Sequence, residues 1–143
     1  MKTHDILELY SVETLHMASQ NWILELEFIK NEHLFFEDLL KTFNLQLIES
    51  QGYGSNSEIV EAMGASKKRN NSLLKYIKKH DRNLKLLVDA KVQPEEEVAY
   101  KAEHKLLMGE LHRHLKEYKY LKTQLFTNVK EVFKKEKQKR LKA

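Results

Sequence analysis

The stretch FIKNEHLFFEDLL, from Phe28 to Leu40, shows most directly how this chain folds. Its apolar residues continue those on either side at alternating spacings of three and four, the period of one buried helix face. The members of this stripe are Trp22, Leu26, Ile29, Phe36, Leu40, Phe43 and Leu47. His33 falls on the same stripe, where a leucine would pack better. The sequence therefore predicts a long amphipathic helix with an ionisable ring on its buried face.

The composition of the whole chain is that of a helical protein. Of 143 residues, 41% are hydrophobic and 32% are charged, with only four glycines and one proline. This balance favours long helices over a sheet. The length fits one core, so we expect a single helical-bundle domain over residues 1–143.

Two segments interrupt the helical pattern and divide the chain into predicted helices at about 5–48, 56–91 and 94–138. The first segment, residues 49–58, contains Gly52 and Gly54 and ends in a Ser55–Glu58 capping box. The second, residues 90–97, contains Pro94, which suits the first position of a helix. A bend in the first helix at residues 16–21 would instead give a four-helix bundle.

Short connections between long helices predict an all-α, elongated up-down-up bundle of three antiparallel helices with coiled-coil-like packing. Phe28, Phe35 and Leu39 lie beside the first stripe and widen it, and dimerisation would cover this surface. Gly64 and Gly109 fall inside helices, where each costs about 1 kcal/mol relative to alanine. They are either tolerated flaws or mark a tight helix crossing.

Apolar stripes with the same spacing continue on the later helices, at positions 59, 63, 66, 70, 73, 77, 80, 84 and 87 of the second and 100, 104, 107, 111, 114, 118, 121 and 125 of the third. Polar residues also fall on these stripes. Asn70 and His80 lie on the second stripe, and His104 and His114 lie on the third. Antiparallel register then predicts two polar layers in the core. The first contains Glu25, His80 and His104, with Asp81 or Glu103, and the second contains His33, Asn70 or Asn71, and His114, with Glu32 or Glu110.

We interpret these layers as hydrogen-bonded core residues that set helix register, with His33 bonded to Asn70 or His114. The alternative is a site for iron, manganese or zinc built from the same histidines and carboxylates, or acid–base catalysis. Di-iron helical bundles need two Glu-x-x-His motifs, and only Glu13-Thr-Leu-His16 matches this pattern. The phosphate-loop and nucleophile-elbow motifs of enzymes are absent from the sequence. We therefore expect a non-catalytic protein without a cofactor.

Charge is unevenly distributed along the chain. Residues 1–50 contain nine acidic and three basic residues, a balance of −6, whereas residues 51–143 contain 22 basic and 12 acidic, a balance of +10. Basic residues crowd the last segment, 130–143, where cations favour the negative end of the helix dipole. A weaker alternative function is nucleic-acid binding through this tail. Its contact residues would be Lys134, Lys135, Lys137, Lys139 and Arg140.

Other features narrow the class of protein. Cysteine is absent, so the chain has no disulfide and requires no oxidising compartment. No uncharged stretch reaches the roughly 18 residues that a membrane-spanning helix needs. We expect a cytoplasmic helical bundle that acts as an interaction or structural module, through self-association or a protein partner.

Overall fold

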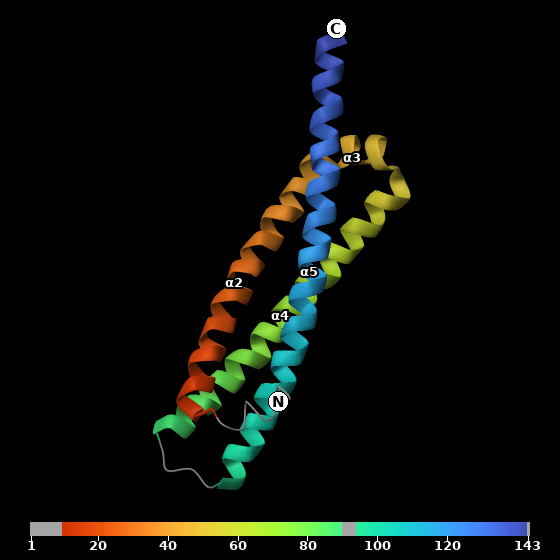
Figure 1. The fold of residues 1–143 in the computed structure, drawn as a ribbon. Coiled ribbons are helices and arrows are strands. Elements are labelled where there is room, and N and C mark those ends of the chain that lie inside the picture. Colours follow the sequence, from red (N-terminus) through yellow and green to blue (C-terminus); the bar gives the residue numbers. More distant parts are fainter. Residues whose placement is uncertain (1–9, 90–93, 143) are drawn as a thin grey trace. The chain divides into compact units, whose positions relative to one another are not determined.

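The computed structural model describes residues 10–89 and 94–142, and its regular structure in these ranges is entirely α-helical (Figure 1). The helices are α2 (Val12–Thr42), α3 (Asn44–Gln51), α4 (Tyr53–Asp89) and α5 (Pro94–Lys142). The predicted all-α class is confirmed, and Pro94 opens α5 as expected. None of the described helices has a segment long and apolar enough to cross a bilayer.

The first predicted helix is divided at a different place from the bend we considered. Helix α2 runs without interruption through residues 16–21, so the alternative in which the helix breaks there is wrong. The interruption lies at Phe43, whose φ of −104° and ψ of 18° depart from helical values. The Phe43 ring makes an edge contact with Phe133, at 5.2 Å between centroids. Residues 5–9 of the predicted helix lie outside the described residues.

The predicted connection over residues 49–58 is much shorter in the structure. Helix α3 continues to Gln51 and α4 begins at Tyr53, so Gly52 alone joins them, with φ of +86°. The backbone N–H of Asn56 donates to the Gly52 carbonyl oxygen at 3.1 Å, which starts the ladder of α4 at the glycine. The Ser55 capping box is therefore wrong, because Ser55 already lies inside a helix.

The described residues form two compact units, and each long helix contributes to both. Unit 1 contains residues 10–30, 69–89 and 94–113, and unit 2 contains residues 31–68 and 114–142. The single domain expected from the sequence stays a prediction. Both units combine a segment of α2, a segment of α4 and a segment of α5.

Contacts within unit 2 fix the direction of its helices. Residues later in α2 and α3 contact residues earlier in α4, so α4 runs antiparallel to them. Residues later in α2 and its continuation contact residues later in α5, so α5 runs parallel to α2. The contacts are His33–Ser66 and Asn44–Asn56 for the first relation, and Phe36–Phe126 and Phe43–Phe133 for the second. The predicted up-down-up order holds in this unit.

The core follows the predicted stripes closely. Leu26, Ile29, Phe36, Leu40 and Leu47 are buried on the first stripe. On the later stripes the buried residues are Met63, Ser66, Asn70, Leu73, Ile77, His80, Leu84 and Leu87, then His104, Leu107, Leu111, His114, Tyr118, Leu121 and Leu125. Each large apolar side chain buried in this way contributes about 1.5–3 kcal/mol.

Two predictions concern the helix surfaces. A Cβ at Gly64 or Gly109 would meet open space, so neither glycine marks a tight helix crossing. Phe28 and Phe35 are 63% and 58% exposed, and Leu39 is partly buried, so apolar surface remains uncovered beside the buried stripe of α2. That dimerisation covers this surface stays a prediction.

Gly52 should be the glycine that the fold needs most. We expect Gly52→Ala to lower the free energy of unfolding by about 1–3 kcal/mol, because a Cβ is strained at this backbone conformation. Gly109→Ala is the matched control, since it adds a Cβ in open space inside a helix and should stabilise by up to about 1 kcal/mol. Urea unfolding monitored by circular dichroism measures both; equal effects of the two substitutions would contradict this account.

Candidate functional site

Unit 1 contains a buried chain of histidines that ends in a carboxylate. His80 of α4 is fully buried, and His104 of α5 is 1% exposed. His80 Nδ1 lies 3.0 Å from Glu103 Oε1, and His80 Nε2 lies 3.0 Å from His104 Nδ1. The His104 ring stacks on Trp22 of α2, with 4.3 Å between centroids and 24° between planes. We call Trp22, His80, Glu103 and His104 the unit 1 cluster.

The hydrogen bonds of this cluster fit neutral rings. Burial lowers the pKa of His80, although the Glu103 charge opposes the shift. Burial, together with the nearby His80, lowers the pKa of His104 to about 4. A carboxylate only accepts, so His80 donates from Nδ1 to Glu103. Its Nε2 then accepts the Nδ1–H of His104, and one proton per ring satisfies both bonds.

Glu25, the carboxylate expected in this layer, is exposed on α2. It precedes the buried Leu26 by one position, and a rotation of about 100° per residue turns it away from the core. Glu103, one of the two alternatives named from the sequence, occupies the position beside His80 instead. The expected association of His80 with His104 is present.

Asp81, the other alternative, belongs to a separate set of contacts in unit 1. Its Oδ1 accepts a hydrogen bond from Ser19 Oγ at 2.8 Å and lies 3.0 Å from His16 Nδ1. Sequence reasoning missed Ser19, which is fully buried. Its position four residues after Leu15 and seven before Leu26 places it on the buried face, and this spacing could have identified it.

Unit 2 contains a second buried polar cluster, formed by Glu32, His33, Ser66 and Tyr118. His33 Nε2 lies 3.0 Å from Ser66 Oγ, and its ring centroid lies 4.9 Å from that of Tyr118. The Tyr118 hydroxyl donates to Glu32 Oε1 at 3.0 Å, and Lys122 Nζ donates to Glu32 Oε2 at 2.7 Å. Burial, followed by the Glu32 charge, raises the pKa of Tyr118, so the phenol keeps its proton and donates.

The remaining predicted core residues, His114 and Asn70, are buried. His114 stacks on Tyr118 in unit 2, with 6.4 Å between centroids. Asn70 belongs to unit 1, where its Nδ2 donates to the Leu26 carbonyl oxygen at 2.9 Å. The predicted layer around His33 did not include Ser66, which His33 contacts. The loop expected between residues 48 and 56 is replaced by the end of α3, the single residue Gly52 and the start of α4, and this changes which residues face each other.

The described residues offer no ready metal site. No group of three or more histidine, aspartate or glutamate side chains in residues 10–89 and 94–142 is placed to hold a metal ion. In the unit 1 cluster both ring nitrogens of His80 already have partners. The arrangement supports hydrogen bonding between helices, and the metal-binding alternative has no ligand set in this part of the chain.

The predicted nucleic-acid contacts all lie on the last turns of α5. Lys134, Lys135, Lys137, Lys139 and Arg140 are exposed. Lys135 Nζ donates to Ser50 Oγ at 3.1 Å, and Lys139 Nζ lies 3.6 Å from Glu49 Oε2. These contacts involve exposed groups and leave the residues accessible, and nucleic-acid binding stays a prediction.

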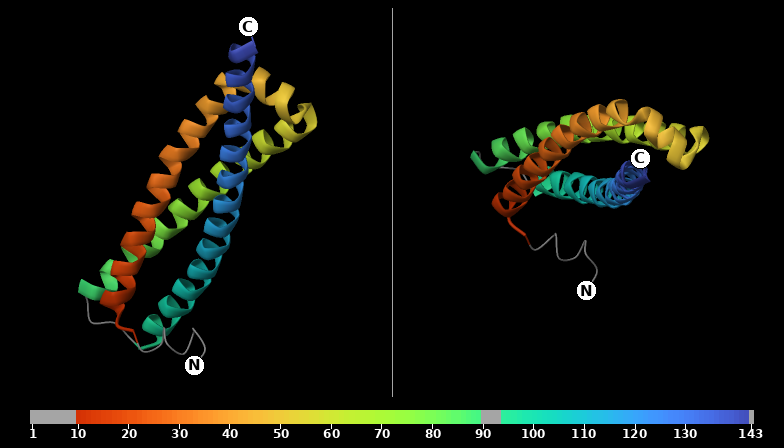
Figure 2. Two further views of the ribbon diagram at one scale, coloured as in Figure 1. Left: turned by 45° about the horizontal axis from the view of Figure 1, so that its top comes forward. Right: turned by 90° about the horizontal axis from the view of Figure 1, so that it is seen from above.

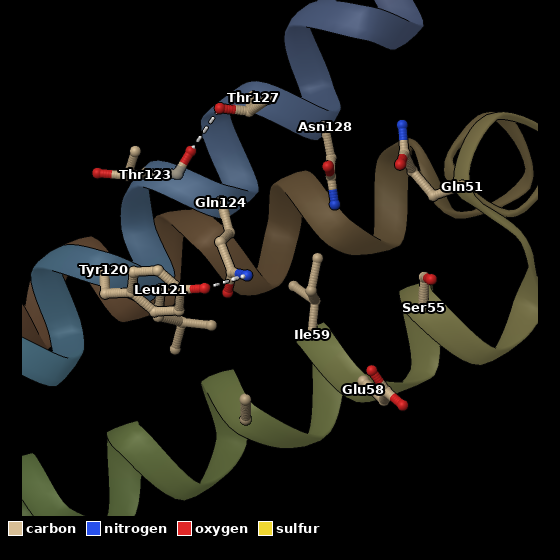
Figure 3. Close-up of a pocket in the computed structure, with 11 residues that line it drawn as sticks. Gln51, Ser55, Glu58, Ile59, Tyr120, Leu121, Thr123, Gln124, Thr127 and Asn128 are labelled. Atoms are coloured by element: carbon tan, nitrogen blue, oxygen red, sulfur yellow. Dashed lines mark hydrogen bonds between the residues drawn. The ribbon is translucent and has the colours of Figure 1, made fainter.

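A hollow in unit 2, between the first turns of α4 and the middle of α5, has a volume of about 580 Å³ (Figure 3). The side chains of Ile59 and Asn128 point into the space between the two helices. Along α5 the polar groups bond within their own helix, from Gln124 to Tyr120 and from Thr127 to Thr123. The hollow contains no cluster of titratable groups among its lining residues.

Comparisons with known proteins give no relative for this arrangement. No protein-family model, curated protein or solved structure matches the chain significantly.

Acid should weaken the fold through the unit 1 cluster. The unfolded chain takes up a proton on His104 near pH 6.5, the ordinary pKa, whereas the folded chain does so only near pH 4. The free energy of unfolding should therefore fall as the pH drops from 6.5 to 4, by about 3 kcal/mol for this residue. Urea titrations at several pH values measure the slope.

The variant His104→Phe keeps a ring against Trp22 but cannot titrate, so its stability should depend less on pH in this window. His112→Phe, an exposed position on the same helix, is the control and should keep the parent slope. If His104→Phe keeps the pH dependence of the parent chain's free energy of unfolding, His104 is not the residue that causes it.

Tyr118→Phe should lower the free energy of unfolding by about 1–2 kcal/mol, because it removes a hydrogen bond to a charged and largely buried acceptor. Tyr120→Phe, two residues further along α5, changes a hydroxyl on a ring that is 67% exposed. Its effect should stay within about 0.5 kcal/mol. Chemical denaturation of both variants makes the comparison, and similar losses would show that the Glu32 contact contributes little.

Proposed function

We propose that this chain is a non-catalytic helical-bundle interaction module that associates through the outward side of α2 in unit 1. The observation that supports it is a row of exposed apolar side chains on this helix. Met17, Leu24 and Phe28 are 65%, 67% and 63% exposed. Their spacings of seven and four residues place them on one side of α2. We call these three residues the α2 row.

The α2 row lies on the side of α2 away from its core. The buried residues of the same segment are Leu15, Ser19, Leu26 and Ile29. They lie roughly 120–180° around the helix from the row, at 3.6 residues per turn. A second apolar side on a helix that already packs on its own unit has no use in folding that unit. Contiguous apolar surface of this kind marks interaction sites.

Charged residues at the edge of the α2 row indicate the partner it fits. Glu13 and Glu25 are exposed and border the row. Glu27 is half-exposed and pairs with Lys78 at 3.0 Å. A partner surface with apolar side chains and basic borders would complement this edge. A second copy is the partner we propose, because residues 51–143 carry an excess of ten positive charges. Self-association is therefore the form of interaction we propose.

The buried clusters support a structural rather than a catalytic role. Reactive histidines need access to a substrate, whereas His80 and His104 are buried, neutral and bonded to each other. Their hydrogen bond connects α4 with α5, and the stacking of His104 on Trp22 connects α5 with α2. We place the module in the cytoplasm, because a chain without cysteine needs no oxidising compartment.

The double substitution Leu24→Ser/Phe28→Ser should weaken self-association at least about tenfold, because each buried apolar side chain contributes about 1.5–3 kcal/mol. Sedimentation velocity over a range of protein concentrations measures this change. Leu86→Ser on α4 is the control, since this leucine is 66% exposed but lies outside the row. A parent chain that stays monomeric throughout, or a double variant that associates like the parent, would refute the proposal.

A further inference from the structure

Unit 1 also carries a groove between α4 and α5, with a volume of about 840 Å³. Tyr76 and Lys79 of α4 line it, together with Glu96, Glu103, Leu106 and Glu110 of α5. We call these six residues the acidic groove. Leu106 and Tyr76 are 71% and 62% exposed, so apolar surface lies open between charged borders.

The charge of the acidic groove is opposite to that of the whole chain. Its three glutamates recur every seven residues along α5, and one lysine faces them. The chain as a whole has a formal charge of +4. Heptad spacing aligns the carboxylates in a row about 21 Å long, at 1.5 Å per residue. A groove with aligned carboxylates and an exposed leucine fits a cationic helix that carries an apolar side chain.

The last turns of α5 have this chemistry. Val132 is buried, but every residue from 134 to 142 is exposed or only partly covered. This segment has six basic residues and one acidic residue, and its Leu141 is 76% exposed. Figure 2 shows the end of α5 continuing past α3, which belongs to the same unit. Nine helical residues extend about 13.5 Å, which the carboxylate row can accommodate.

We propose that the acidic groove of one copy binds the α5 end, residues 134–142, of a second copy. The proposal rests on charge complementarity and exposed apolar groups, independently of the α2 row. Two different surfaces meet in this contact, so the interface is heterologous. When each copy uses both surfaces, the copies assemble into a closed ring or an open filament. Exposed charges dominate it, so added salt should weaken it.

The test separates this contact from the α2 row by using the Leu24→Ser/Phe28→Ser chain as the parent. A groove variant adds Glu96→Lys and Glu110→Lys, which reverse the carboxylate row but leave Glu103 beside His80. A tail variant adds Lys137→Glu and Arg140→Glu. A control variant adds Lys116→Glu and Lys119→Glu, an exposed pair with the same spacing on the same helix. Circular dichroism verifies that each variant keeps its helix content.

Sedimentation velocity at low salt should show that the parent and the control associate, while the groove and tail variants alone associate at least about tenfold more weakly. An equimolar mixture of the two should form heterodimers and nothing larger, because each partner supplies one intact half. A mixture that stays monomeric, or single variants that associate like the parent, would overturn the proposal.

The same variants test the competing use of the basic tail. Binding of a duplex oligonucleotide at several salt concentrations reports contacts to phosphate. If the tail variant loses this binding and the mixture forms no heterodimer, the α5 end serves a nucleic acid and the proposal is wrong. If the mixture forms heterodimers and the groove variant binds the oligonucleotide no better than the control, the groove is the partner of the tail.

Discussion

A buried imidazole gives up its hydration and must find protein partners for its ring nitrogens, and this constraint organises the interior of both units. An unpaired polar group in a core costs about 1–3 kcal/mol, comparable to the gain from burying a leucine. His80 meets the constraint through Glu103 and His104, and His33 meets it in part through Ser66. Each solution requires a particular residue on the neighbouring helix at a particular height, so it selects one register among many that would bury the apolar stripes equally well.

The two clusters solve this problem with different acceptors. In unit 1 a half-exposed carboxylate accepts a hydrogen bond from a fully buried ring, so the negative charge stays near the surface while the histidines remain neutral. In unit 2 the carboxylate of Glu32 accepts hydrogen bonds from the Tyr118 hydroxyl and the Lys122 ammonium group. Neither arrangement buries a charged pair completely, and both avoid the larger desolvation cost of a fully enclosed ion pair.

The stripes were predictable from the sequence because burial follows a simple period. Every predicted position on α4 from Met63 to Leu87 is buried, including Ser66, Asn70 and His80. The pairing of His80 with His104 also followed from the length of the connection near Pro94. The pairing of His33 was not predictable in the same way, since it depends on how α3 and Gly52 turn the chain. Glycine and polar residues over 49–58 indicate a turn but do not indicate that one residue suffices. The predicted placement of Glu25 in the core was wrong for a simpler reason, because one position along a helix separates the exposed Glu25 from the buried Leu26.

Glu103 has two roles at once, since it accepts a hydrogen bond from His80 Nδ1 and also lines the acidic groove. A cation that approaches its carboxylate from the groove draws electron density from the oxygen atoms that hold the imidazole. A proton added to His80 makes the ring a cation, which neutralises part of the Glu103 charge and reduces the negative charge available in the groove. Thermodynamic linkage makes this competition reciprocal, so occupancy of the surface and protonation of the interior each lower the affinity for the other. If a cationic segment occupies the groove as proposed, protonation of His80 and binding of that segment therefore oppose each other through this one side chain.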